Sequence, residues 1–130
     1  MPDIDPDRVA RFFERYAAAL SGNDLDTLAA CYAYPSIVVT ADDSMVIDTP
    51  RQVLAAFKVE RRADEVVTAS ARLRSFESPG GSLAWVTVRW SYTALGGAEV
   101  SSDAYRYLVR ETAGEVRICT VTPVPTDWAG

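Results

Sequence analysis

The sequence contains no histidine among its 130 residues. Ser–His–Asp and Cys–His catalytic arrangements are therefore excluded within this chain, because both use an imidazole as the general base. The two cysteines, Cys31 and Cys119, lie far apart in apolar surroundings, which favours small buried residues over a disulfide. We expect no metal site, since zinc prefers histidine and cysteine ligands. Any proton transfer has to use Asp, Glu, Tyr, Lys or a thiol.

Long apolar segments, basic runs and phosphate loops are also missing. No stretch of about 18 consecutive apolar residues is present, so no membrane-spanning helix is expected. The acidic start, MPDIDPDRVARF, is unlike a signal peptide and predicts a cytoplasmic protein. A net charge of −5 without a basic run argues against nucleic acid and anionic membranes as partners. The stretches SPGGS and LGGAE are typical of turns, and no cofactor is expected.

What is present predicts one domain over residues 1–130 with three helices. A hydrophobic fraction of 48% is sufficient for a core at this length. The first helix, residues 3–22, has Asp5 as its N-cap, Pro6 at its first position and Gly22 at its end. Its apolar residues follow the spacing of one buried face: Val9, Phe12, Phe13, Tyr16, Ala17 and Leu20.

Two further helices are shorter. Residues 25–33 predict a second helix that is stopped by Pro35. Residues 48–62 predict a third, which begins at Thr49 and Pro50 and has Phe57 on its apolar face.

The remaining pattern predicts strands. Two short pieces, residues 36–40 and 45–47, lie between the second and third helices. Four long strands follow, joined by short glycine-containing turns: residues 65–78, 83–94, 98–111 and 115–124. Short turns between long strands favour consecutive antiparallel pairing. Helices segregated from an antiparallel sheet define the α+β class.

Alternation along the strands assigns side chains to faces. Asp103 and Tyr105 share a face with Tyr107 and Val109, which places the Asp103 carboxylate on the interior side. A carboxylate there either takes part in a pocket, with a raised pKa, or is solvated near the strand end or paired with an arginine. Residues 83–94 are apolar on both faces, so one face would meet the helices and the other a partner subunit. For Trp90, packing is favoured over ligand stacking.

The stretch RYAAALSGNDLDTLAACYA, residues 15–33, followed by a short strand, a helix and a meander, resembles the NTF2-like superfamily. That group includes SnoaL-like polyketide cyclases and ketosteroid isomerases. The resemblance covers nearly the whole chain. It implies a strongly curved antiparallel sheet packed around three N-terminal helices as a cone, with a mostly apolar pocket at the open end. It also implies a homodimer that forms through the outer face of the sheet.

Within the superfamily, the closest similarity is to the ketosteroid isomerase pattern RYxxALxxGDLDxxxxLFA. By that resemblance Tyr16 falls on the pocket tyrosine, and Asp103 in DAYRY falls on the second oxyanion-hole residue. The two would hydrogen-bond a carbonyl or enolate oxygen. The position of the isomerase base is held by Thr40, so Asp42 becomes the candidate base. The alternative for the ADDS segment is a solvated turn.

Together these observations predict a small-molecule pocket protein for a hydrophobic, oxygen-bearing ligand. Four residues are expected to line the ligand site: Tyr105, Trp90, Thr40 and Phe57. If the protein is an enzyme, the reaction would be cofactor-free proton transfer of the isomerase, cyclase or dehydratase type. The alternative is a non-catalytic NTF2-like dimerisation or interaction module.

Overall fold

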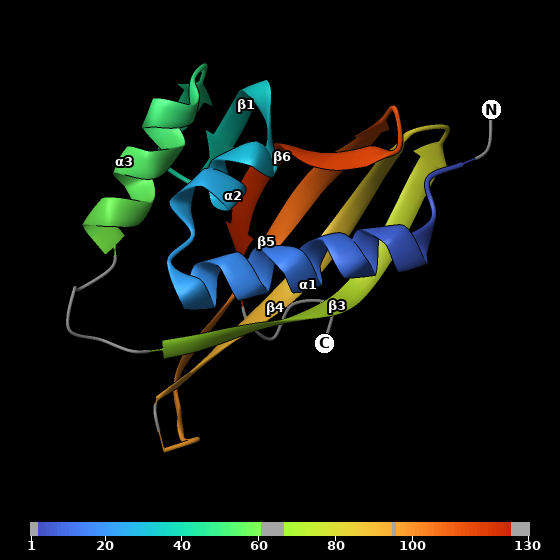
Figure 1. Ribbon diagram of the computed structural model, residues 1–130. Helices are drawn as coiled ribbons and strands as arrows, with labels where there is room; N and C mark the ends of the chain where they lie inside the picture. Colours follow the sequence, from blue (N-terminus) through green and yellow to red (C-terminus); the bar gives the residue numbers. More distant parts are fainter. Residues whose placement is uncertain (1–2, 61–66, 95, 126–130) are drawn as a thin grey trace.

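The computed structural model describes residues 3–60, 67–94 and 96–125 (Figure 1). Its helices are α1 (Pro6–Gly22), α2 (Leu25–Ala30) and α3 (Pro50–Glu60). Its strands are β1 (Tyr32–Val39), β2 (Ser44–Ile47), β3 (Val67–Gly80), β4 (Leu83–Ala94), β5 (Glu99–Thr112) and β6 (Glu115–Val124). None of the helices described is both long and apolar enough to cross a membrane.

The strands form one curved sheet in the order β2-β1-β6-β5-β4-β3. Strands β3 to β6 are the predicted antiparallel meander. The sequence did not predict how the sheet continues: β1 pairs parallel with β6 and antiparallel with β2. The two short pieces therefore extend the meander, and α1 lies across the concave face of the sheet (Figure 1). The α+β cone is confirmed.

The predicted second helix is too long by three residues. It ends at Ala30, and Tyr32 and Ala33 belong to β1, which also contains Pro35. The reason is a contact that is distant in sequence. The Ile118 N–H donates to the Cys31 carbonyl at 2.8 Å, which starts the pairing of β1 with β6. The helical spacing of this segment could not reveal that competing partner.

Helix α1 begins as predicted. The Asp5 side chain accepts a hydrogen bond from the Asp7 N–H, and Pro6 is the first helical residue. The helix ends at Gly22 as predicted, and the residue that caps it is Asn23, which adopts the left-handed conformation (φ 56°) and whose N–H bonds back to the helix. The Asp24 carboxylate then caps α2. This tight connection fixes how α1 and the start of β1 lie relative to each other.

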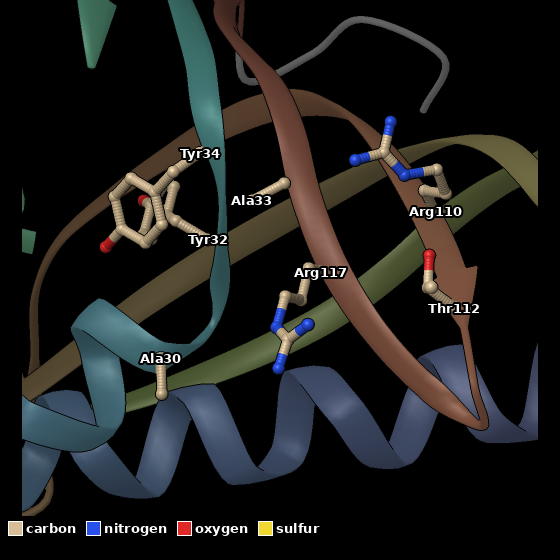
Figure 2. A pocket seen from close by; sticks show the side chains of 7 residues that line it. All are labelled: Ala30, Tyr32, Ala33, Tyr34, Arg110, Thr112 and Arg117. Atoms are coloured by element: carbon tan, nitrogen blue, oxygen red, sulfur yellow. The ribbon is translucent and has the colours of Figure 1, made fainter. Parts of the chain in front are cut away.

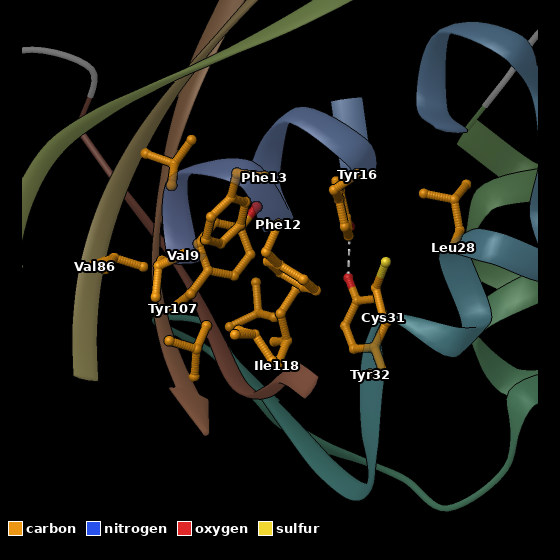
Figure 3. Packing of buried hydrophobic residues seen from close by; sticks show 14 of the residues in the cluster. Val9, Phe12, Phe13, Tyr16, Leu28, Cys31, Tyr32, Val86, Tyr107 and Ile118 are labelled. Atoms are coloured by element: carbon orange, nitrogen blue, oxygen red, sulfur yellow. Dashed lines mark hydrogen bonds between the residues drawn. The ribbon is translucent and has the colours of Figure 1, made fainter. Parts of the chain in front are cut away.

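The core lies between α1 and the concave face. On that face of β4, the side chains of Ala84, Val86, Val88 and Trp90 are buried. On β5, Tyr107 and Val109 are buried, which confirms the predicted interior face of that strand. Phe12 and Phe13 of α1 pack against this surface, and the Phe13 ring lies 4.9 Å from the Tyr107 ring, tilted by 49° (Figure 3).

Candidate functional site

Tyr16 lies on the buried face of α1 with 3% of its surface exposed. Its hydroxyl shares a hydrogen bond of 2.7 Å with the Tyr32 hydroxyl (Figure 3). Burial and the neighbouring Tyr32 raise the pKa of Tyr16 well above its ordinary value. The side chain is therefore neutral at physiological pH and keeps its proton for hydrogen bonding.

Trp90 and Tyr107 form a second buried polar pair. The Trp90 indole N–H donates to the Tyr107 hydroxyl at 2.9 Å, and the Trp90 ring lies 5.4 Å from the Tyr16 ring. Trp90 has 1% of its surface exposed. The favoured prediction of packing for Trp90 agrees with this burial, and its polar edge is used inside the core.

Asp103 lies on the concave face of β5, directly opposite Trp90 in the β4–β5 register. The Tyr92 hydroxyl donates to its carboxylate, with distances of 3.1 and 3.3 Å to the two oxygens. Partial burial raises the pKa of Asp103, and the hydrogen bond from Tyr92 lowers it by less. The carboxyl is thus half-buried beside a tyrosine, and among the described residues no arginine forms a salt bridge with it.

Tyr92 is a residue that the sequence reasoning missed as a partner of Asp103. The available signal was alternation, because Tyr92 follows Trp90 by two positions and shares its face. Tyr105 lies on the same face of β5, half-buried, with its ring 6.1 Å from that of Tyr107. The Phe57 side chain falls outside the described residues.

Tyr16 and Asp103 are not joined by a hydrogen bond in the part of the chain that the structure describes. Trp90 links them indirectly, since its ring contacts Tyr16 and its backbone pairs with Asp103. The two predicted oxygen-binding groups face the same interior, but each is engaged with another tyrosine.

Thr40 and Asp42 lie in the exposed turn between β1 and β2. The Thr40 hydroxyl accepts from the backbone N–H groups of Asp42 and Asp43, at 3.4 and 3.1 Å. Strand β1 ends at Val39, before Thr40, so alternation along a strand does not place Asp42 on the same face as Thr40. Thr40 lies one residue beyond the end of β1, and Tyr32 is the first residue of that strand. At about 3.3 Å per residue the two are on the order of 25 Å apart along the strand. The turn therefore lies well away from the Tyr16–Tyr32 pair.

A pocket of about 380 Å³ opens at another place, beside the start of β1 and the β5–β6 hairpin (Figure 2). Its lining includes Tyr32 but neither Tyr16 nor Asp103. Among the residues described, no group of three or more Cys, Asp or Glu side chains is arranged to hold a metal ion.

An open, curved sheet that wraps a long helix and directs polar side chains to its concave face defines an NTF2-like fold. The chain belongs to the family described as NTF2-like protein (DUF6841), whose model matches residues 6–126. This match confirms the superfamily that the sequence resembles. No curated protein matches the chain.

Several solved structures have a similar fold. An NTF-2 like protein of unknown function from Shewanella oneidensis MR-1 has a TM-score of 0.74 at 15% identity, covering 90% of this chain and 96% of that one. Aln2 from a Streptomyces species has a TM-score of 0.73 at 15% identity, covering 97% and 96%. ActVI-ORFA from Streptomyces coelicolor has a TM-score of 0.68 at 12% identity, covering 92% and 95%. At such identities the likeness shows the fold alone.

Proposed function

We propose that this protein binds a small hydrophobic molecule carrying a carbonyl or hydroxyl oxygen, on the concave face beside Asp103. The observation that carries the proposal is the half-buried Asp103 carboxyl, with its raised pKa and its Tyr92 hydrogen bond. When protonated, such a carboxyl donates to a ligand carbonyl; when ionised, it accepts from a ligand hydroxyl. Tyr105, which is partly buried on the same face of β5, supplies aromatic surface next to it.

Tyr16 is a second hydrogen-bond donor in this proposal, and in the free protein its hydroxyl is already engaged. Its hydroxyl bonds to Tyr32, so a ligand oxygen would have to replace Tyr32 as the partner. Ligand binding at Tyr16 therefore requires a rotation of one tyrosine side chain. Catalysis by proton transfer, of the isomerase, cyclase or dehydratase type, additionally needs a base. Asp42 could serve only if its exposed turn moved, which is why we place binding before turnover.

Titration with naphthol, a phenol that mimics an enolate, tests the proposal. We expect binding to the wild type and a loss of about tenfold in Asp103→Asn or Tyr92→Phe, since each removes a hydrogen bond to a charged or chargeable group. Glu14→Gln, an exposed carboxyl on α1, is the matched control and should bind as the wild type does. Equal affinity in Asp103→Asn and the wild type would refute the site.

Turnover is tested separately, with a panel of steroid enones assayed for isomerisation. Activity that is lost in both Asp42→Asn and Tyr16→Phe would establish the catalytic extension. No turnover above background, together with naphthol binding that depends on Asp103, leaves a binding protein.

A second function, a homodimerisation module, is favoured by the outer face of the sheet. Ile37 and Val46 lie directly opposite each other in the β1–β2 pair and are 41% and 49% exposed. Farther along the sheet, β4 presents Trp85 on the same outer side, half-buried. Apolar side chains on a sheet face that α1 does not cover favour contact with a second copy of the chain. A homodimer through this face is consistent with the chain being an NTF2-like protein, and a cytoplasmic location remains a prediction of the sequence.

Sedimentation equilibrium of two lysine variants tests the dimer. Val46→Lys puts a charge on the outer face and should weaken self-association. Met45→Lys is matched to it, since Met45 is the preceding residue, is 50% exposed and points to the other face. A wild type that stays monomeric at all concentrations, or two variants that dissociate equally, would contradict the outer-face dimer.

A further inference from the structure

The pocket at the β5–β6 hairpin lies on the opposite side of the sheet from Asp103. Arg110 and Thr112 alternate with Val109 along β5, and Val109 is buried in the core on the concave side. The end of α2 and the start of β1 complete the pocket (Figure 2). Its lining residues are Ala30, Tyr32, Ala33, Tyr34, Arg110, Thr112 and Arg117. The pocket is therefore a separate site from the one proposed above.

The charge of this pocket is positive, on a chain with a net charge of −5. Arg110 and Arg117 are directly opposite each other in the β5–β6 register, an arrangement that costs stability when nothing neutralises it. None of the seven lining residues is acidic. Glu115 pairs with Arg117 at 2.6 Å, whereas no salt bridge to Arg110 is found in the described ranges. The arrangement leaves a place for one more anionic group.

Apart from Thr112, the remaining lining residues are alanines and tyrosines. Ala30 and Ala33 leave room beside the arginines, and Tyr34 contributes aromatic surface. The Tyr32 ring is turned to the concave side, where its hydroxyl bonds to Tyr16. The Tyr34 hydroxyl donates to the Ala29 carbonyl at 2.6 Å, which holds that side chain in place. The volume of about 380 Å³ lies in the range of small-molecule sites.

We propose that this pocket binds a small organic anion, a carboxylate attached to a flat ring. The guanidinium groups of Arg110 and Arg117 hold the carboxylate, since their planar N–H pairs match its two oxygens. The Thr112 hydroxyl donates to the same group, and the ring of the ligand lies against the alanines and Tyr34. The charge selects the anion, and the apolar lining selects a ligand with a ring.

Calorimetric titration with naphthoate tests the proposal on the full chain. We expect naphthoate binding that weakens with added salt. The affinity should fall about tenfold or more in Arg110→Gln and in Arg117→Gln. Arg110→Lys keeps the charge but not the planar pair of N–H groups, and should lose less affinity. Arg72→Gln is the matched control. Arg72 also faces an arginine across a strand pair, but does not line the pocket. Thermal unfolding confirms that each variant is folded.

Three outcomes would overturn the anion site. Naphthoate affinity that is unchanged in the Arg110→Gln, Arg117→Gln double variant removes the arginines from the site. Equal binding of inorganic phosphate and naphthoate removes the role of the ring. Naphthol binding that equals naphthoate binding and is lost in the same double variant removes the role of the charge. Asp103→Asn should leave naphthoate binding unchanged, so failure here is distinguishable from failure of the concave site.

Discussion

Folding raises the pKa of the Asp103 carboxyl in the candidate site. This carboxyl sits beside Trp90 and Tyr92, partly out of water, and its pKa is raised from the ordinary value of 3.8. A raised folded-state pKa means that the folded chain binds this proton more tightly than the unfolded chain does. The resulting stabilisation is complete below pH 3.8 and is lost as the pH rises through the folded-state pKa. At neutral pH the half-buried charge therefore destabilises the fold.

The destabilisation by the Asp103 charge at neutral pH gives a prediction for Asp103→Asn, which keeps the shape of the side chain and removes its charge. We expect the variant to gain thermal stability relative to the wild type near pH 7, and to lose that gain near pH 4. Circular dichroism melts at the two pH values provide the measurement. Glu14→Gln, on an exposed position of α1, should give the same difference from the wild type at both. A gain for Asp103→Asn that is larger in acid would show that the sign is wrong.

The Tyr16–Tyr32 hydroxyl pair gives a second prediction at the residue scale. Each hydroxyl is a partner of the other at 2.7 Å inside the core, so one Phe substitution removes half of the bond and leaves the other half buried. The two substitutions should not be additive. We expect the double variant to cost less than the sum of the single variants, with a coupling of about 0.5–3 kcal/mol.

Urea denaturation of the four proteins in this double-mutant cycle measures the coupling. Tyr34→Phe, whose hydroxyl bonds to a backbone carbonyl instead, is the control and should be additive with Tyr16→Phe. Full additivity of Tyr16→Phe and Tyr32→Phe would mean that the shared bond contributes nothing to stability. The pair would then be free to open for a ligand at no cost.

At the scale of the elements, Ser21 joins the end of α1 to the edge strand β3. Its hydroxyl donates to the Ala17 carbonyl at 2.9 Å and accepts from the Ala69 N–H at 2.9 Å. Because β3 is at the edge of the sheet, backbone groups such as that of Ala69 have no strand partner on the outer side. One side chain thus supplies a hydrogen bond that the sheet cannot.

Ser21→Ala should therefore destabilise the protein by about 1–2 kcal/mol, because the half-buried Ala69 N–H loses its acceptor. Chemical denaturation measures the change, and hydrogen exchange at Ala69 locates it. Ser82→Ala, at an exposed turn, should be close to neutral. If Ser21→Ala behaves as Ser82→Ala does and exchange at Ala69 is unaltered, then α1 does not secure β3 through this bond.

Elements with local signals were predictable from the sequence, and those with distant partners were not. The bounds of β4 and β6 agree with the prediction, since alternation and glycine turns mark both ends. The α2–β1 boundary was wrong because residues 30–33 are compatible with either structure locally. The deciding contact is with Ile118, almost at the other end of the chain.

For the molecule as a whole, the resemblance and the alternation of side chains predicted the cone and its interior face. They could not predict the partners within it. The Tyr16–Tyr32 and Tyr92–Asp103 bonds depend on side-chain rotamers and on how α1, β1, β4 and β5 pack together. The pocket with Arg110 and Arg117 was missed as well, since its two arginines lie on different strands and meet only through the β5–β6 register.

The absence of histidine leads to a last prediction, for the whole protein. Of the groups that could titrate near neutral pH, the thiols are displaced: burial raises the pKa of Cys31 to about 11 and also raises that of Cys119. Buried Tyr16 and Tyr107 titrate far above neutrality. With no imidazole in the sequence, proton binding by side chains should hardly differ between the folded and unfolded states from about pH 6 to 7.

The thermal midpoint should then stay constant within about 2 °C over that interval. Calorimetric melts at closely spaced pH values check this. A falling midpoint across the interval would identify a carboxyl that titrates near neutrality, and if Asp103→Asn abolished the fall, the pKa of Asp103 would lie high enough for it to act as a proton donor to a bound ligand.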